Sequence, residues 1–516
     1  MQTIDQIKLI VGMEIHVELA TRTKMFSRAL SPAFAGHENA EPNTYIDPVV
    51  LALPGALPVM NKAAIEMAMM VGIALNCSTA KITKWDRKSY FYPDLPKSYQ
   101  ISQYDLPLSF DGAFDLPAAD EDGFPDFSQP SKRIGITRAH LEEDAGKLLH
   151  EAPGGGASKD TLADYNRAGT PLLEIVTQPD FSSADDVVLF AKLLRQVCRY
   201  LGVTLGVMQK GHMRFEPNIN CILTLSDGHT ITTPIVEIKN LNSFKSLKAA
   251  IEFEHREQPS RWQADGRVMG RGMKTTRGWD DTKNITFVQR EKEDAHDYRY
   301  FPDPDLLPVK VDAAWREAVA ARIPELPLVR YRRYASDYGL AVKEAGQLVE
   351  DRETSDYYEA AINALVELGI ARPRAGKAAA NILLQTAAKR ANEGSGTTAG
   401  TGAQRLDQTG VTAMEVAAIV KLREDGKINN QAVEVLFAAC INALASDATP
   451  TLAQTLTHVE ALASEKGLLI VRDDAAMSAW IDQVLAANPK VAEDVKLSLI
   501  HISEPTRLRR ISYAVF

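Results

Sequence analysis

The spacing of apolar residues changes once along the chain, near residue 300, and this change limits the folds that the chain can adopt. Residues 1–300 hold short runs in which apolar and polar residues alternate between turn-forming residues, as in β-strands with one buried face. Residues 310–495 are rich in Ala, Leu, Val and Glu at helical spacing. We therefore predict an α+β fold, with strands in the first part and an all-α region after it.

Length, charge and cysteine content exclude several classes of protein. The chain has 516 residues and a formal net charge of −9, from 58 Lys and Arg against 67 Asp and Glu. No run of about 18 apolar residues is present, so we expect no membrane span. The N-terminus lacks the basic and apolar regions of a secretory signal, and the four cysteines are far apart with no C-x-x-C. We expect a cytoplasmic protein whose contacts with nucleic acid are local.

The sequence contains no P-loop, no strand-flanked G-x-G-x-x-G, no G-x-S-x-G and no H-E-x-x-H, so the chemistry must come from polar residues on strands. The run VGMEIHVEL, at residues 11–19, places Glu14, His16 and Glu18 on one face of a strand. Two carboxylates beside an imidazole can hold a hard divalent cation or share protons. An edge strand with a solvated polar face is the alternative interpretation.

The same alternation recurs in RFEPNINC, residues 214–221, and in IVEIKN, residues 235–240, while IGITRAHLEED, residues 134–144, ends in acids. Strands with one apolar and one carboxylate-bearing face predict an antiparallel sheet with an open acidic side. Convergent carboxylates repel one another unless a metal ion neutralises them, and Mg²⁺ on oxygen ligands is typical of phosphoryl transfer. The polar residues of these runs include Glu142, Glu143, Asp144, Arg214, Glu216, Asn218, Asn220, Glu237 and Lys239.

Two further segments carry polar residues that are candidates for a site. DRKSYFYPDLPKSYQISQYD, residues 86–105, interleaves basic residues such as Lys88 with tyrosines, which can clamp phosphates and stack on a base or ribose. A proline-rich loop packed by its own tyrosines fits the same composition. In DYNRAGTPLLEI, residues 164–175, Glu174 follows a buried run and is either a site residue or the partner of Arg167.

Together these residues resemble the B subunit of the aspartyl/glutamyl-tRNA amidotransferases. The similar stretches occur in order and cover most of residues 8–308, and the helical part is similar more loosely, through IPELP, GKAAANILL and residues 411–496. The stretches in the first part are VGMEIHVEL, PNTYIDPVVLALPGALPVMN, DRKSYFYPDLPKSYQISQYD, GITRAHLEEDAGKL, DYNRAGTPLLEIVTQPD, VEIKNLNSF and DYRYFPDPDL.

The resemblance implies a three-part architecture and a two-step reaction. It implies a catalytic cradle at residues 1–300, a helical domain at 301–408 and a small helical tail that grips tRNA at 409–496. In the reaction, ATP with Mg²⁺ phosphorylates the side-chain carboxylate of Glu or Asp misacylated onto tRNA(Gln) or tRNA(Asn). Ammonia then displaces the phosphate. Which of the two tRNAs is served stays open.

Residue roles follow from the same resemblance. The implied metal ligands are Glu14, His16, Glu143 and Glu216, although Glu216 in MQKGHMRFEPN stands where Asp is usual. Lys88 is expected to steady phosphate or the acyl phosphate. The implied catalytic residues are His16, Lys88, Glu143, Glu174 and Lys239, with Glu237 as a further candidate on the same sheet.

The resemblance also implies partners: an amidase, the A subunit, that supplies ammonia, a small C subunit that braces the complex, and misacylated tRNA. The chain itself has no amidase Ser–Ser–Lys signature, so it is not expected to make ammonia. The alternative functions are a stand-alone metal-dependent hydrolase and a non-catalytic tRNA-binding subunit. Residues 497–516, LSLIHISEPTRLRRISYAVF, resemble a translated sequencing-library adapter. We expect them to be foreign and the tail domain to be truncated, with a genuine basic tail as the alternative.

Overall fold

The computed structural model describes residues 3–37, 39–151, 157–270, 272–291, 298–389, 405–441, 450–470, 474–487 and 489. The chain forms two compact units, Met1–Asp407 and Gln408–Phe516, which are treated separately below. The expected end of the tail and the adapter-like segment, residues 490–516, lie outside the described residues. The division into a cradle, a helical domain and a tail stays a prediction.

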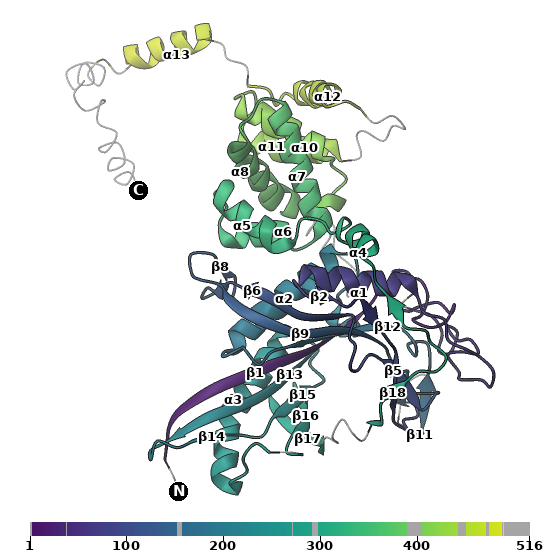
Figure 1. The fold of residues 1–516 in the computed structure, drawn as a ribbon. Helices are drawn as coiled ribbons and strands as arrows, with labels where there is room; N and C mark the ends of the chain where they lie inside the picture. Colours follow the sequence, from purple (N-terminus) through teal and green to yellow (C-terminus); the bar gives the residue numbers. More distant parts are fainter. Residues whose placement is uncertain are drawn as a thin grey trace. The chain divides into compact units, whose positions relative to one another are not determined.

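One large sheet forms the centre of the first unit (Figure 1). Its strands follow the order β17-β16-β15-β13-β1-β12-β9-β6-β2, and β14 pairs with β13. Neighbouring strands run antiparallel, except for β15 and β16, which run parallel. This sheet, together with the helices described below, confirms the predicted α+β class. The strands are β1 (Ile4–Glu18), β2 (Ser78–Thr79), β6 (Ser109–Leu116), β9 (Lys132–Glu143), β12 (Pro171–Thr177), β13 (Met213–Leu225), β14 (Thr230–Thr232), β15 (Val236–Lys239), β16 (Thr275–Asp280) and β17 (Ile285–Glu291).

Strand β1 lies in the middle of this sheet and has the predicted alternation. Met13, Ile15 and Val17 are at most 1% exposed, because successive side chains of a strand point to opposite faces and these three point into the core. His16, which lies between Ile15 and Val17, points to the other face. In the sheet register it is opposite Glu174 of β12 on one side and Arg214 of β13 on the other. The register therefore collects polar side chains from three strands on one face.

Helices α1 (Lys62–Ala74), α2 (Ala184–Tyr200) and α3 (Phe244–Asp265) begin at side-chain caps. The side chains of Asn61, Ser183 and Ser243 each accept a hydrogen bond from a backbone N–H of the first turn, which satisfies a donor that has no partner inside the helix. Asn and Ser are favoured at this position, and in the sequence Ser183 directly precedes an apolar helical run.

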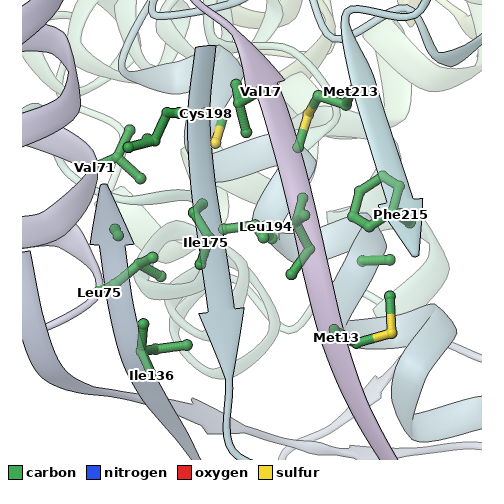
Figure 2. Packing of buried hydrophobic residues seen from close by; sticks show 14 of the residues in the cluster. Met13, Val17, Val71, Leu75, Ile136, Ile175, Leu194, Cys198, Met213 and Phe215 are labelled. Atoms are coloured by element: carbon green, nitrogen blue, oxygen red, sulfur yellow. The ribbon is translucent and has the colours of Figure 1, made fainter. Parts of the chain in front are cut away.

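The apolar face of the sheet packs against α1 and α2. Figure 2 shows Val71 of α1, Leu75 directly after that helix, and Leu194 and Cys198 of α2, together with strand residues such as Ile175. These residues are fully buried, and they belong to one continuous cluster that runs across the sheet. Burial of this face leaves the opposite face for polar chemistry.

Short strands complete the first unit around residue 300. Strand β18 pairs with β4, and β4 pairs with β5, so residues near 301 lie beside the tyrosine-rich segment 86–105. The short strands outside the large sheet form this three-stranded sheet and the pairs β10-β11, β19-β3 and β7-β8. These strands are β3 (Ile82–Thr83), β4 (Asp86–Ser89), β5 (Tyr99–Ser102), β7 (Ala118–Ala119), β8 (Pro125–Asp126), β10 (Lys147–Glu151), β11 (Ala157–Asp164), β18 (Phe301–Pro302) and β19 (Val309–Lys310).

Helices follow residue 312, as predicted. In the first unit, α5, α6, α7 and α8 pack in succession, and in the second unit α10 packs against α11 and α12. None of the helices in the described part of the chain is long and apolar enough to span a membrane. The helices are α4 (Ala313–Ala320), α5 (Pro327–Asp337), α6 (Val342–Val349), α7 (Arg352–Glu367), α8 (Arg372–Ile382), α10 (Ala413–Glu424), α11 (Asn430–Cys440), α12 (Leu452–Glu465) and α13 (Asp474–Ala487).

Candidate functional site

His16 lies at the centre of the polar face of the sheet. Its Nε2 atom is 3.6 Å from Glu174 Oε2 and 3.9 Å from Glu142 Oε1. The three residues come from β1, β12 and β9, which are adjacent strands, and their ligand atoms all lie within 4.8 Å of one another. We call His16, Glu142 and Glu174 the histidine cluster.

The histidine cluster has the donor set of a divalent-cation site. One imidazole nitrogen and two carboxylates suit Mg²⁺ or Mn²⁺, which bind oxygen ligands readily and accept histidine nitrogen. The Nδ1 atom of His16 is buried without a hydrogen-bond partner in the described structure. That nitrogen faces Glu216 at 3.8 Å, which leaves Nε2 on the side of Glu142 and Glu174, and the donor set of the cluster fits a bound cation.

A second group of carboxylates lies next to the first. Glu14, Glu216 and Glu237, from β1, β13 and β15, also have oxygen atoms within 4.8 Å of one another. We call them the lysine-bound cluster, because Lys239 and Lys274 contact them. Lys239 Nζ is 2.7 Å from Glu216 Oε2, and Lys274 Nζ is 3.1 Å from Glu237 Oε2.

Burial and nearby charge set the protonation of the histidine cluster. Burial, with the charge of Glu174, raises the pKa of Glu142 to about 7. Burial acts in the same direction on Glu174, but His140 and His16 outweigh it and hold the pKa of Glu174 well below its usual value. Burial lowers the pKa of His140 to about 4, whereas for His16 the hydrogen bond to Glu174 and the charge of Glu216 overcome burial and raise the pKa. A cation that binds here must therefore displace protons from Glu142 and His16.

Lys88 of β4 faces the histidine cluster from the tyrosine-rich segment. Its Nζ atom lies 5.0 Å from the ring centre of Tyr298 and 5.8 Å from that of Tyr90. Burial would lower the pKa of Lys88, but the carboxylate of Glu142 and neighbouring tyrosines raise it instead. Lys88 is thus a half-buried ammonium kept charged by a nearby carboxylate, which suits the binding of a phosphate or an acyl phosphate.

Glu143, expected as a metal ligand with Glu14 and His16, lies outside both clusters, and its role stays a prediction. Its Oε1 atom accepts hydrogen bonds from the backbone N–H of Ile101, at 3.0 Å, and from Lys97 Nζ. It belongs to neither cluster, and Glu142 takes the position beside His16.

A register shift in β9 explains why Glu142, and not Glu143, lies beside His16. The pairing with β12 shifts between Ile136 and Arg138, so one extra β9 residue is accommodated there. Ile136 is buried in the core before the shift, and Ala139 and Leu141 are buried after it. An unbroken alternation from Ile136 would place Glu143 on the polar face, and the shift places Glu142 there instead. The spacing of two residues between His140 and Glu142 is the signal that identifies the correct face.

A polar cavity of about 790 Å³ reaches the lysine-bound cluster at Glu216, whose Oε1 atom is 3.8 Å from His16 Nδ1. Arg214 lines it, and its Nε atom is buried without a hydrogen-bond partner in the described residues, although the guanidinium pairs with Asp144. Basic side chains dominate the charged lining, so the cavity suits an anion such as a phosphate. Its charged lining residues are Glu18, Lys147, Asp164, Arg167, Lys210, Arg214, Glu216 and Lys239.

The structure brings most of the predicted site residues together. His16 and Glu174 share the histidine cluster, Glu14 and Glu216 share the lysine-bound cluster with Lys239, and Lys88 faces Glu142. The sequence patterns did not identify His140, Lys274 or Tyr298 as neighbours of the site. The chemical roles of the predicted site residues stay predictions.

Family models and curated relatives match most of the length of this chain, and their names agree with one another. A family described as "GatB/GatE catalytic domain" matches residues 9–317, and one described as "GatB domain" matches residues 361–498. Curated relatives include proteins of Rhodopirellula baltica, 39% identical over 94% of this chain and 89% of the relative, and Synechococcus elongatus, 40% identical over 94% and 90%. A protein of Nostoc punctiforme is 40% identical over 94% of this chain and 89% of its own length. All three are named as the B subunit of aspartyl/glutamyl-tRNA(Asn/Gln) amidotransferase.

Proposed function

The chain belongs to the family of aspartyl/glutamyl-tRNA(Asn/Gln) amidotransferase B subunits, and from this premise we propose that its polar cavity phosphorylates and then amidates a tRNA-bound Glu or Asp side chain. The observation that carries the proposal is the position of His16 between Glu142 and Glu174, at 3.9 and 3.6 Å. The same ring lies 3.8 Å from Glu216, which lines a cavity together with arginine and lysine. This arrangement supports phosphoryl transfer because charge on phosphoryl oxygens needs several cationic groups.

The proposed reaction has two balanced steps. In the first, a carboxylate oxygen of the esterified Glu or Asp attacks the γ-phosphorus of ATP, and the bond to the bridging oxygen breaks to release ADP. In the second, ammonia attacks the acyl carbon, the carbon–oxygen bond to phosphate breaks, and an amide forms as a proton is lost. Phosphorylation is needed because a free carboxylate is a poor electrophile with no good leaving group.

The histidine cluster would hold Mg²⁺, which when bound supplies positive charge next to the phosphoryl oxygens. Arg214 would bind phosphate oxygens through its Nε–H, which has no hydrogen-bond partner in the described structure. Lys88, which Glu142 keeps in the charged form, would contact the acyl phosphate. Each of these side chains is held on a strand of a sheet, so it is positioned before the substrate arrives.

Ammonia would come from a partner. The sequence has no amidase signature of its own, and the relatives are named as the B subunit of an amidotransferase. We propose an assembly with an amidase A subunit, which uses glutamine as the nitrogen donor, and with a small C subunit. The misacylated tRNA would bind in part through the second unit.

The test is the conversion of Glu-tRNA(Gln) to Gln-tRNA(Gln) by the assembled complex with ATP and Mg²⁺. Ammonium chloride replaces glutamine, so that the assay reports the site on this chain and not the partner amidase. We expect His16→Ala and Glu174→Gln to lower the rate at least about a hundredfold. Glu121→Gln, at an exposed turn, is the control and should keep the rate. Full conversion by both site variants would overturn the proposal in favour of a non-catalytic tRNA-binding subunit.

A further inference from the structure

The lysine-bound cluster has the acids of a second cation site, but two ammonium groups already occupy its oxygens. The two oxygens of Glu237 each face a lysine: Oε1 is 3.2 Å from Lys239 Nζ and Oε2 is 3.1 Å from Lys274 Nζ. Glu237 is fully buried, so both contacts are shielded from bulk water. In the histidine cluster, by comparison, His16 and His140 face Glu174 at 3.6 and 3.7 Å, and the guanidinium of Arg138 is farther away, at 4.0 Å.

Lys274 completes this arrangement from a distant part of the sequence. It immediately precedes β16, which runs parallel to β15 and places Thr276 opposite Glu237. Its Nζ atom also lies 3.4 Å from Glu14 Oε1, an oxygen that accepts a hydrogen bond from Asn218 Nδ2 at 2.9 Å. Lys274 therefore joins Glu14 to Glu237.

Each of the two lysines contacts two of the three carboxylates, and both contact Glu237. Lys239 contacts Glu216 and Glu237 and lines the polar cavity, whereas Lys274 contacts Glu14 and Glu237 and is absent from the lining of that cavity. Lys274 is thus a structural counter-ion behind the site, and Lys239 is the lysine that a substrate can reach.

We infer that Lys274, together with Lys239, closes the lysine-bound cluster to divalent cations, so that the protein binds one such ion, at the histidine cluster, and not two. A divalent ion would have to lie about 2.0–2.6 Å from oxygens that already contact ammonium groups. It would then be a few ångströms from two positive charges in a buried setting, where like charges repel strongly. The inference rests on the proposed function only for the ion at the histidine cluster.

The experiment counts Mn²⁺ bound by the full chain, using the loss of the free-ion paramagnetic resonance signal during titration. Lys274→Met removes the charge and keeps most of the length of the side chain, and Lys274→Arg keeps the charge. Lys274→Gln is a second neutral variant in case Lys274→Met does not fold. Lys283→Met, on the neighbouring turn and 70% exposed, is the matched control.

We expect one Mn²⁺ for the natural chain, Lys274→Arg and Lys283→Met, and two for Lys274→Met and Lys274→Gln. Adding Glu14→Gln to Lys274→Met should remove the second ion. The inference is overturned if the natural chain binds two ions and loses one with Glu14→Gln, or if neither neutral variant gains an ion. If the natural chain binds none and Lys274→Met gains one that depends on Glu14, this inference holds while the proposed Mg²⁺ site at the histidine cluster fails.

Discussion

The Nδ1 atom of His16 lies 3.8 Å from Oε1 of Glu216, so one imidazole links the histidine cluster to the lysine-bound cluster. The other oxygen of Glu216 is 2.7 Å from Lys239. Burial would raise the pKa of Glu216, but Lys239, His16 and Arg214 lower it to about 2. Glu216 is therefore an ionised bridge between the two clusters, and it keeps this charge across the physiological pH range.

The choice of Glu142 over Glu143 can be tested by metal binding. Glu142→Gln should weaken Mn²⁺ binding at least about tenfold, because a neutral amide replaces a carboxylate in the histidine cluster. Glu143→Gln should leave the affinity unchanged, since Glu143 pairs with Lys97 on the other face. Isothermal titration calorimetry measures both. Equal weakening by the two substitutions would contradict the placement of these residues.

Arg214 should contribute to nucleotide binding. Arg214→Met removes a guanidinium that lines the polar cavity, and we expect ATP to bind about ten- to a hundredfold more weakly, as for a lost charge-assisted hydrogen bond. Arg214→Lys keeps the charge and should lose less. Fluorescence titration with a labelled ATP gives the dissociation constants, and Arg256→Ala, on the exposed surface of α3, is the control. Unchanged affinity in Arg214→Met would place the phosphates elsewhere.

Lys24 should make the stability of the protein depend on pH. Burial lowers the pKa of Lys24 from its ordinary value of 10.5 to about 7, although Asp47 and Glu143 oppose the shift, and its Nζ donates to the carbonyl of Ala168 at 2.6 Å. Below pH 7 both the folded and the unfolded chain hold the proton. Between about 7 and 10.5 only the unfolded chain holds it, so the free energy of unfolding rises with pH.

Denaturant unfolding of the natural chain and of Lys24→Met tests this dependence. From pH 7 to pH 10, the free energy of unfolding of the natural chain should rise by on the order of 3 kcal/mol more than that of Lys24→Met. Lys343→Met, at an exposed position of α6, should keep the natural slope. Parallel pH profiles for the natural chain and Lys24→Met would show that Lys24 does not titrate in this range.

The packing of α2 on the sheet should contribute strongly to stability. Leu194 is fully buried and lies in the cluster shown in Figure 2. Leu194→Ala should lower the free energy of unfolding by about 2–5 kcal/mol, because the helix and the sheet cannot fully close the cavity. Val366→Ala, at a position 38% exposed on α7, should cost much less. Denaturant unfolding that gives the same loss for both would contradict the packing.

Sequence patterns within single strands and helices were enough to predict the fold class. The alternation in VGMEIHVEL fixes which face of β1 is buried, and Ser183 followed by an apolar helical run identifies the start of α2. Both depend on neighbours in the sequence, so local physical rules suffice. The strand that contains Glu142 and Glu143 is different, because the shift at Ile136 reverses the alternation and is set by pairing with β12.

Contacts between distant segments could not be predicted from single runs. Lys274 reaches Glu14 across 260 positions of the chain, and it precedes a strand whose partner, β15, is parallel. Tyr298 approaches Lys88 because β18 pairs with β4. These placements follow from the order of strands in the sheets, which the pattern of a single strand does not determine.

The most direct test of the central claim is the rate of ADP formation in a single turnover by the assembled complex with Glu-tRNA(Gln). The comparison is between Glu142→Gln and Glu143→Gln, two neighbouring substitutions of the same chemistry on opposite faces of β9. We predict that Glu142→Gln slows ADP formation at least about a hundredfold and that Glu143→Gln changes it by less than about threefold. Rapid ADP formation by Glu142→Gln would contradict the assignment of phosphoryl transfer to the histidine cluster.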